Sequence, residues 1–513
     1  MKYNKEKIIS KLIPISIIFI IFLISRLLVM GSIYFSHNNP INIIYFRWFS
    51  NNAKIEVPFQ INNLIIDVVS PQEQNIKLFF NEELLTEFKL VQGRYTQFFE
   101  FKNNKKDNNL IRLESDFVFI PPNDPRELSY QVYNMYINGD LSKNLIINLN
   151  NTQGIHGREI HPKELKSIKQ TLREGLKKWD ASWYTSIIEK GYQWDGDTTR
   201  SQNKAFLYLF PFLSYLLKIF TGLDSFVVGV IVNNLMVFIS MILLYFISYL
   251  NTEDKMKSYT GVILLAFNPF AVFTVSSFCE GTFMAATAFS ILFLYKRRYG
   301  MFAIAGGAMN ATRQNGLIAP IVLIIDYFFI EKNKVNLKNI IKILFYSLLS
   351  LWGFIIDLLY NKIKFNDFFA TYNAHRAWGT IGGEQSMRIF FDYIFTPFNF
   401  KVLDPNFISV VLLYTIVIFT IIYIAKNKFI INRLDKILLL FCYGILSLIV
   451  IAVMPKTNPN TLGRLILTLF PILAIIAKTE KIHYKYIICT IIAIFVFYMF
   501  ISTTRFSFGL PPV

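Results

Sequence analysis

The sequence predicts a polytopic α-helical membrane protein with an all-β domain inserted after its first helix. Of its 513 residues, 53% are hydrophobic and only 17% are charged, against about 25% charged residues in ordinary soluble domains. Apolar runs of about 20 residues recur along the chain, and each is long enough to cross a hydrocarbon core about 30 Å thick. A long polar region with the alternation of β-strands follows the first of these runs.

The first apolar run, residues 8–30, is expected to be a retained signal anchor. It is long, it contains Arg26, and no small-residue cleavage site follows it. Because the short N-terminal segment is basic, we expect it to stay in the cytoplasm, which puts the next region outside. The expected domains are the anchor at 1–35, an extracytoplasmic β-sandwich at 36–165 and a transmembrane domain at 166–513.

Seven short stretches of the second region alternate apolar and polar residues, with Asn, Gly, Pro and Asp between them. This pattern is typical of a β-sandwich. All three cysteines lie in apolar segments elsewhere, so we expect no disulfide in this domain. The predicted strands are 64–69, 76–80, 87–91, 95–101, 110–119, 130–136 and 144–149. A polar helix is expected to follow at 162–178.

From residue 205 onward, the chain is expected to be almost entirely embedded in the membrane, with about 11 spans in all. The two longest apolar stretches, 259–295 and 300–330, must contain breaks or fold as hairpins, because ~20 residues suffice to cross. The other predicted stretches are 205–222, 226–250, 339–360, 406–425, 437–454, 464–478 and 486–503.

The formal net charge is +18, and its basic residues gather in short tracts between apolar runs. This is the pattern of cytoplasmic loops in membrane proteins, so we exclude nucleic-acid binding. Loop 251–258 is then inside only if the stretch 205–222 does not cross completely. The same rule places 361–405 and 455–463 outside.

Several separated polar residues come to the outer face in this topology. Asp180 lies in the segment Trp179-Asp180-Ala-Ser-Trp-Tyr184, in the external region before the second group of spans. Glu280 lies at the turn of one hairpin and Arg313 in the break of the next. The external loop that carries His375-Arg376 and the start of the span at Arg464 complete the set.

Seven short motifs that include these residues occur in one order along the chain. Together they resemble the PIG-V family of mannosyltransferases and its bacterial relatives, within the GT-C class of polyprenyl-phosphate-sugar-dependent glycosyltransferases. Two departures, at Leu207-Tyr208 and at His375, concern the specificity for sugar or acceptor. The motifs are Ser25-Arg26-Leu27, Trp179-Asp180…Tyr184…Gly191-Tyr192, Ala205-Phe-Leu-Tyr-Leu-Phe-Pro211, Asn268-Pro269…Glu280, Ala311-Thr-Arg-Gln-Asn-Gly316, Tyr372-Asn-Ala-His-Arg-Ala-Trp-Gly379 and Gly463-Arg464…Phe470-Pro471.

The resemblance implies an integral enzyme of the plasma membrane that moves a hexose, with mannose expected, from a polyprenyl-phosphate donor to an extracytoplasmic acceptor with inversion. The acceptor is a glycan, a glycolipid or a protein. Asp180 is the expected general base, since the acceptor hydroxyl must lose a proton. The residues expected to bind the donor phosphate are Arg464, Arg313, Arg26 and Arg376, because a guanidinium binds two phosphate oxygens at once. Those expected around the sugar or acceptor are Trp179, Tyr184, Glu280, His375 and Trp378.

Each assignment has a plainer alternative. Asp180 would also suit the N-cap of a helix that runs to Gly191. Glu280 would suit the support of an arginine as well as contact with sugar hydroxyls, and its plainer alternative is a hairpin turn in contact with water. Arg26 would reach the interface by extending its side chain along the lipid, and His375 with Trp378 would anchor the chain at that interface.

The sequence indicates no certain cofactor and leaves two rival functions to be considered. Asp195-Gly196-Asp197 resembles the metal-nucleotide motif of soluble glycosyltransferases, but we interpret it as a solvated loop because no βαβ unit surrounds it. No His/Cys cluster has metal-ligand spacing. The sequence leaves open whether a divalent metal binds at the Asp180 loop. The rival functions are a transporter or flippase of lipid-linked glycans, which would use Arg26, Glu280 and Arg313 as a pathway, and a non-catalytic protein of envelope assembly.

Overall fold

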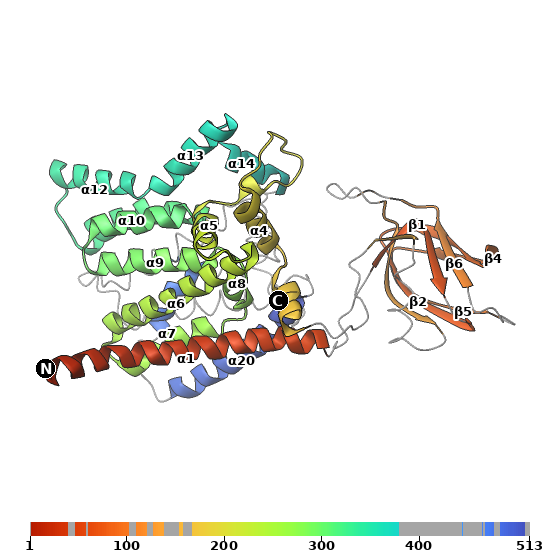
Figure 1. Cartoon of the computed structure of the whole chain (residues 1–513), viewed down its shortest axis with the longest axis horizontal. Helices are drawn as coiled ribbons and strands as arrows, with labels where there is room; N and C mark the ends of the chain where they lie inside the picture. Colours follow the sequence, from red (N-terminus) through yellow and green to blue (C-terminus); the bar gives the residue numbers. More distant parts are fainter. Residues whose placement is uncertain are drawn as a thin grey trace. The chain divides into compact units, whose positions relative to one another are not determined.

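The computed structural model describes residues 2–38, 47–57, 60–101, 109–118, 120, 127–137, 153–156, 167–378, 444, 464, 467–476 and 483–507. The chain divides into two compact units, one of residues 39–167 and one of residues 1–38 with 168–513. Figure 1 labels the helices and strands of both. The smaller unit is made of strands and the larger one of helices.

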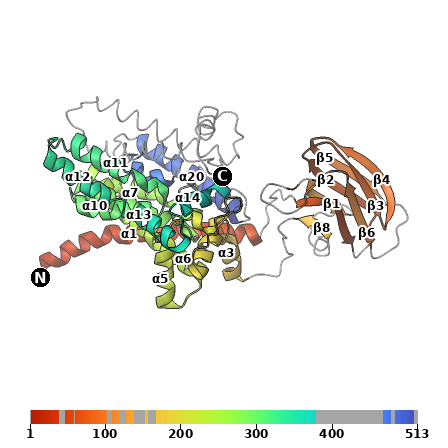
Figure 2. The ribbon, with the colours of Figure 1, turned by 90° about the horizontal axis from the view of Figure 1, so that it is seen from above.

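The β unit holds eight described strands that pair antiparallel. Along the sheet the order is β4-β3-β6-β1-β7-β2-β5, with β8 beside β1 (Figure 2). The strands are β1 (Arg47–Val57), β2 (Asn63–Ser70), β3 (Gln74–Phe80), β4 (Glu83–Leu90), β5 (Gly93–Glu100), β6 (Asn109–Ser115), β7 (Tyr130–Ile137) and β8 (Gln153–His156).

β1 joins two halves of this sheet. Residues 47–49 pair with β7, which continues to β2 and β5. Residues 52–57 pair with β6, which continues to β3 and β4. Side chains of both halves, among them Ile66 of β2 and Leu113 of β6, belong to one buried core. Two half-sheets over one core are the basis of a sandwich.

Six of the seven predicted strands are confirmed in place, although the predicted 110–119 strand ends earlier, at Ser115. The predicted strand 144–149 lies outside the described residues. The prediction missed β1 because Ser50-Asn51-Asn52 interrupts its apolar pattern with residues that favour turns. These residues stand where β1 leaves β7 and begins to pair with β6. Of the polar helix predicted at 162–178, the described residues form a helix over Ile168–Leu176, and residues 162–166 lie outside the described part of the chain.

The helical unit contains three described helices long and apolar enough to cross a membrane. The apolar segments are Ile13–Ser36 of α1, Ser225–Thr252 and Cys489–Ser507. Two further helices, Leu337–Leu349 and Trp352–Phe365, meet at 49° and together make a fourth candidate. The predicted total of about 11 spans stays a prediction, because the stretch 406–425 and nearly all of 437–454 lie outside the described residues.

The first apolar stretch after the Trp-Asp motif does not make a full span. Its helix α5 (Leu209–Thr221) has 13 residues, which is about 20 Å of helix against a hydrocarbon core of about 30 Å. The helix ends at Gly222, whose φ of 67° is left-handed and therefore suits glycine. Loop 251–258 was expected inside only if the stretch 205–222 does not cross the membrane completely, and the length of α5 meets this condition.

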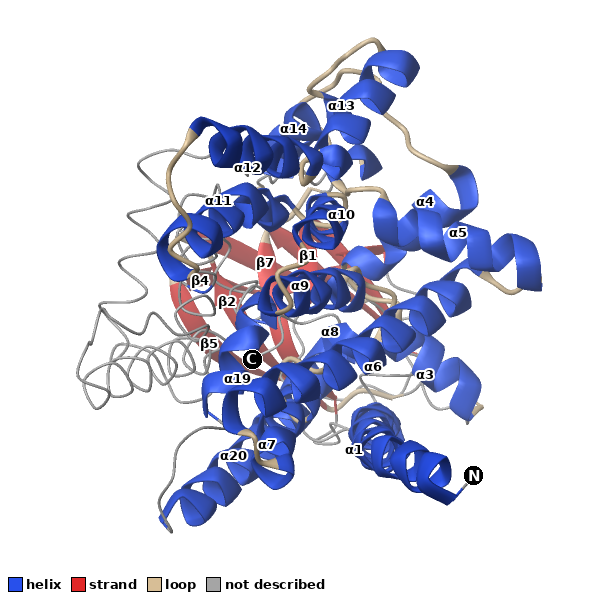
Figure 3. Cartoon of the chain, turned by 90° about the vertical axis from the view of Figure 1, so that its left-hand side faces the viewer, coloured by secondary structure: helices blue, strands red, loops and turns tan. Residues whose placement is uncertain are grey.

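Both long apolar stretches contain the expected breaks. The first divides into α7 (Lys255–Ala266), α8 (Val272–Val275) and α9 (Glu280–Tyr295), and the second is interrupted after α10 (Tyr299–Asn310). α9 lies between α6 and α10 (Figure 3). The remaining described helices are α1 (Lys2–Asn38), α3 (Ile168–Leu176), α4 (Asp180–Lys190), η2 (Asn203–Ala205), α6 (Ser225–Thr252), η3 (Gln314–Ile318), α11 (Ala319–Ile324), η4 (Ile325–Ile330), α12 (Leu337–Leu349), α13 (Trp352–Phe365), α14 (Ala370–Ala374), η5 (His375–Trp378), η8 (Leu467–Ile472), α19 (Leu473–Ile476) and α20 (His483–Ser507).

Candidate active site

Asp180 is the first residue of α4, and its carboxylate does not cap that helix. The N-cap position belongs to Trp179, without a capping hydrogen bond from its side chain. Trp179 has φ 53° and ψ −134°, a backbone conformation that costs a non-glycine residue of order 1–3 kcal/mol. The N-cap interpretation of Asp180 is therefore wrong. Its carboxylate accepts a hydrogen bond from Arg464 instead.

Four of the predicted residues form one cluster of ion pairs. Arg464 donates to Asp180 through Nη1 and to Glu280 through Nε. Arg313 donates from Nη1 to the same Oε1 of Glu280 at 2.7 Å. Two carboxylates and two guanidinium groups thus come together from four parts of the chain. We call these residues the ion-pair cluster.

Glu280 is the most buried member of the cluster, with 1% of its side chain exposed. Among the described residues, its second oxygen, Oε2, finds no hydrogen-bond partner. A carboxylate this deep requires cationic partners, because losing one of them leaves an uncompensated charge at a cost of about 3–5 kcal/mol. The alternative of a turn residue in contact with water is therefore wrong.

Two phenylalanines fix the position of Arg464. Its Cζ lies 4.9 Å from the ring centre of Phe278 and 5.7 Å from that of Phe273. A guanidinium over an aromatic face is held by the ring quadrupole as well as by its ion pairs. Only 13% of the Arg464 side chain is exposed, so the charge is held in place yet still accessible.

Asn233 of α6 secures the break that presents Glu280. Its side-chain amide donates to the carbonyl oxygens of Phe273 and Ser276, and its Oδ1 accepts from the N–H of Gly281. A Cβ on Gly281 would lie 2.3 Å from the Asn233 carbonyl oxygen, so only glycine permits this approach. The start of α9 is thereby fixed against α6.

Tyr184 anchors α4, one turn after Asp180. The side chain is 2% exposed and meets the rings of Phe206, Phe210 and Phe278 edge-on at 4.9–6.4 Å. Burial raises the pKa of its hydroxyl. These ring contacts, together with a hydrogen bond between the side chains of Tyr184 and Cys279, hold the helix of Asp180 beside the break before α9.

Arg26 lies outside the ion-pair cluster but close to the same short helix. Its Nη1 donates to Thr274 of α8 at 3.1 Å, and its Cζ lies 4.6 Å from the ring centre of Phe22. The residue is 4% exposed, and its Nε and Nη2 have no hydrogen-bond partner in the part of the chain that the structure describes. The snorkelling alternative is therefore wrong, because the guanidinium is enclosed by protein. Phe273, next to Thr274, lies under Arg464.

The loop after α14 carries the remaining predicted residues. His375 forms a hydrogen bond with the backbone of Ala205, and burial together with the positive charge of Lys204 lowers its pKa to about 4. Arg376 is exposed. Trp378 is the last residue of η5, and its side chain lies outside the described part of the structure. The described contacts do not bring His375 or Arg376 into the ion-pair cluster.

Sequence reasoning missed a second buried ion pair beside this loop. Lys204 is fully buried and its Nζ lies 2.9 Å from Oδ1 of Asp357 on α13. Oδ2 of Asp357 accepts from Thr371 at 2.7 Å and from Asn361 at 3.1 Å. Burial lowers the pKa of Lys204, and Asp357 opposes that shift. A single acidic residue inside the apolar stretch 339–360 was the available signal.

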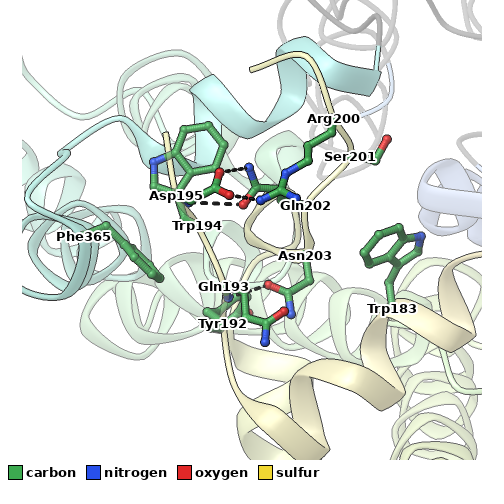
Figure 4. Close-up of a pocket in the computed structure, with 10 residues that line it drawn as sticks. All are labelled: Trp183, Tyr192, Gln193, Trp194, Asp195, Arg200, Ser201, Gln202, Asn203 and Phe365. Carbon is green, nitrogen blue, oxygen red and sulfur yellow. Dashed lines mark hydrogen bonds and ion pairs between the residues drawn. The ribbon is translucent and has the colours of Figure 1, made fainter. Parts of the chain in front are cut away.

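The Asp195-Gly196-Asp197 segment is a solvated loop, as predicted. Both carboxylates pair with Arg200, and 45% and 41% of their side chains are exposed. Gln202 closes the loop by hydrogen bonds with Asp195 (Figure 4) and by donating to the carbonyl of Asp197. Among the described residues, no group of three His, Cys, Asp or Glu side chains is placed to hold a metal ion.

Comparisons with known proteins give similarities to solved structures only. No family model matches the chain, and neither does any curated protein. ArnT from Cupriavidus metallidurans bound to undecaprenyl phosphate has 9% identity and a TM-score of 0.42 over 66% of this chain and 73% of that one. The apo oligosaccharyltransferase of Archaeoglobus fulgidus has 12% identity and a TM-score of 0.40, over 65% of this chain and 52% of that one.

Arabinosyltransferase EmbB from Mycobacterium smegmatis has 10% identity and a TM-score of 0.26, over 96% of this chain and 64% of that one. All three TM-scores lie below 0.5. The function proposed below therefore rests on the residues of the site and on the motifs. The resemblance to the PIG-V family stays a prediction.

Proposed function

We propose that this chain is an integral membrane glycosyltransferase of the GT-C type that takes its sugar from a polyprenyl-phosphate donor. The ion-pair cluster carries the proposal. In it Asp180 pairs with Arg464, and Arg464 and Arg313 both pair with Glu280, beside apolar helices. Displacement at an anomeric carbon needs a base for the acceptor proton and positive charge for the departing phosphate. The order of the sequence motifs supports the same class.

In this mechanism Asp180 takes the proton of the acceptor hydroxyl. The hydroxyl oxygen forms a bond to the anomeric carbon while the bond from that carbon to the phosphate oxygen breaks. Polyprenyl phosphate leaves with the electron pair of that bond, and Arg464 and Arg313 balance its charge. A single displacement inverts the anomeric configuration.

The pairing of Asp180 with Arg464 suggests how binding of the donor makes Asp180 available as the base. In the cluster the charges of two carboxylates and two arginines cancel. A donor phosphate adds negative charge and competes for Arg464. Once Arg464 binds the phosphate, Asp180 loses its partner and is able to accept a proton. Arg26, enclosed beside α8 and with Nε and Nη2 lacking a partner among the described residues, adds positive charge to the side of the site assigned to the same lipid phosphate.

The finer assignments belong to the same proposal. The transferred sugar is a hexose, with mannose expected, and the acceptor is a glycan, glycolipid or protein of the cell envelope. The site faces the extracytoplasmic side of the plasma membrane, with the N-terminus in the cytoplasm. Glu280, Trp179, His375 and Trp378 surround the sugar or acceptor, and Arg376 lies at the entrance for phosphate.

The test compares membranes containing wild type, Asp180→Asn or Glu189→Gln, fed radiolabelled polyprenyl-phosphate mannose and a total envelope extract. Glu189 is an exposed carboxylate on the same helix, so its substitution is the matched control. We expect label in a new product with wild type and Glu189→Gln, and a loss of about 10²–10⁴-fold with Asp180→Asn. Equal transfer by all three would show that Asp180 is not the base, and no transfer from any lipid-linked sugar would favour a transporter.

A further inference from the structure

A cavity of about 540 Å³ opens in the helical unit between α4 and the end of α13. Its volume falls within the range of about 300–1,000 Å³ that small-molecule sites occupy. Four of its ten lining residues are aromatic, and they come from α4, from the loop after it and from α13 (Figure 4). These four are Trp183, Tyr192, Trp194 and Phe365. The others are Gln193, Asp195, Arg200, Ser201, Gln202 and Asn203.

The wall of this cavity continues from the helix of the proposed base. Trp183 follows Asp180 by three residues on α4. Residues three apart on a helix lie on one face, separated by about 4.5 Å along its axis. Measured along the axis of α4, a molecule stacked on Trp183 is therefore within one helical turn of Asp180.

Hydrogen bonds hold the loop in shape before any ligand arrives. Asn203 accepts from the N–H of Gln193 at 2.7 Å and donates to the carbonyl of Gly191 at 3.0 Å. The indole N–H of Trp194 donates to Asp367 at 3.2 Å, which fixes the orientation of that ring. A preformed site loses little conformational entropy on binding.

The charges of the cavity favour a neutral ligand. Arg200 is the cationic residue in its lining, and this side chain already pairs with Asp195 and with Asp197. Hydrogen bonds from Thr199 lower the pKa of Asp197, so this carboxylate stays charged at neutral pH. Within the lining, a phosphate would therefore meet only an arginine that is already paired. The Nζ of Lys364, which is not a lining residue, lies 5.7 Å from the ring centre of Phe365, so binding of phosphate is measured separately below.

We infer that this cavity binds a carbohydrate acceptor, with its rings stacked on Trp183 and Trp194 and its hydroxyls bonded to the polar lining. Sugar rings present C–H faces that pack on aromatic rings, and their hydroxyls need donors and acceptors around the rim. This inference rests on the proposed function, because it names the acceptor class of that reaction. It selects a glycan, free or as the head of a glycolipid, over a protein acceptor.

The test is calorimetric titration of the full chain in detergent with mannotriose, maltotriose, chitotriose and, separately, inorganic phosphate. Ser201 is exposed and lines the cavity, so Ser201→Trp fills the space without removing a described contact. Ser201→Ala is the matched control. We expect at least one trisaccharide to bind wild type and Ser201→Ala, and to bind Ser201→Trp and Trp183→Ala at least about tenfold more weakly, which is about 1.4 kcal/mol.

Asp180→Asn separates this inference from the proposed function. The cavity does not include Asp180, and in the proposed mechanism Asp180 contacts only the attacking hydroxyl of the acceptor. This variant should therefore keep most of its affinity for the trisaccharide, even though its sugar transfer falls about 10²–10⁴-fold. The inference is overturned if no trisaccharide binds wild type, or if Ser201→Trp binds as tightly as Ser201→Ala. It is also overturned if Ser201→Trp weakens the binding of phosphate and leaves that of the trisaccharide unchanged.

Discussion

Neutralising one partner of the Lys204–Asp357 pair should destabilise the helical unit far more than neutralising both. The two side chains are 0% and 4% exposed and lie 2.9 Å apart. Lys204→Met leaves a buried carboxylate without its cation, and Asp357→Asn leaves a buried ammonium. In the double variant no buried charge remains, and the Asn amide oxygen is still able to accept from Thr371, as Asp357 does.

The magnitude follows from the distance and the burial. At 2.9 Å and an effective dielectric constant of about 20, the attraction is about 6 kcal/mol. Desolvation costs several kcal/mol per ion, so the pair contributes little net stability. Removing one partner loses the attraction and keeps the other ion's desolvation cost, which amounts to about 3–5 kcal/mol for each single variant. The double variant should lie near wild type, so the coupling energy is several kcal/mol.

The assay is thermal unfolding of the detergent-solubilised chain, followed by tryptophan fluorescence at one scan rate for all variants. The exposed Lys362→Met on the same helix, α13, is the control for loss of a lysine. Both single variants should unfold at clearly lower temperature than the control, and the double variant should recover most of the difference. If the double variant is destabilised by the sum of the singles, the two charges do not compensate each other and the reasoning fails.

Three further predictions concern the site. Trp179→Gly should unfold at higher temperature than Trp179→Ala, because glycine tolerates positive φ at about 1 kcal/mol less cost. The His375 pKa is lowered from 6.5 to about 4, so its contribution to stability is complete above pH 6.5 and declines as the pH falls toward 4; His375→Gln should flatten this decline in unfolding scans. Arg464→Lys should lower sugar transfer about 10²–10³-fold, because an ammonium cannot reproduce the two directed contacts with Asp180 and Glu280.

A specific result would contradict each of these three predictions. Equal unfolding temperatures for the two Trp179 variants would mean that the backbone relaxes to negative φ. An unchanged pH profile in His375→Gln would mean that the imidazole titrates in the folded chain as it does in the unfolded one. Full transfer by Arg464→Lys, with Arg313→Lys as its companion, would mean that point charges suffice and that the geometry of the guanidinium is unimportant.

The sequence singled out the four residues that the structure brings together in the ion-pair cluster, but not how they interact. Asp180, Glu280, Arg313 and Arg464 came from motifs and from charges at the edges of apolar runs, and the structure joins all four. The support of an arginine by Glu280 was among the predictions, but its pairing with both Arg313 and Arg464 was not, because that depends on the exact turn of two helix breaks. Those turns are set by close contacts, such as Gly281 against Asn233, which no local pattern encodes.

The elements that sequence reasoning missed share a cause. β1 contains Ser50-Asn51-Asn52, which favour a turn, yet it pairs with two different strands. Lys204 has the local sequence of a polar loop, yet it is buried and paired with Asp357 of a distant helix. In both, residues distant in the chain override the local preference. Asp180 shows the converse, since its local preference for an N-cap is real but gives way to Arg464, 284 positions later. Trp179, directly before Asp180, has a positive φ of 53°, and no local sequence pattern predicts this strained backbone, which is of a kind that clusters at active sites.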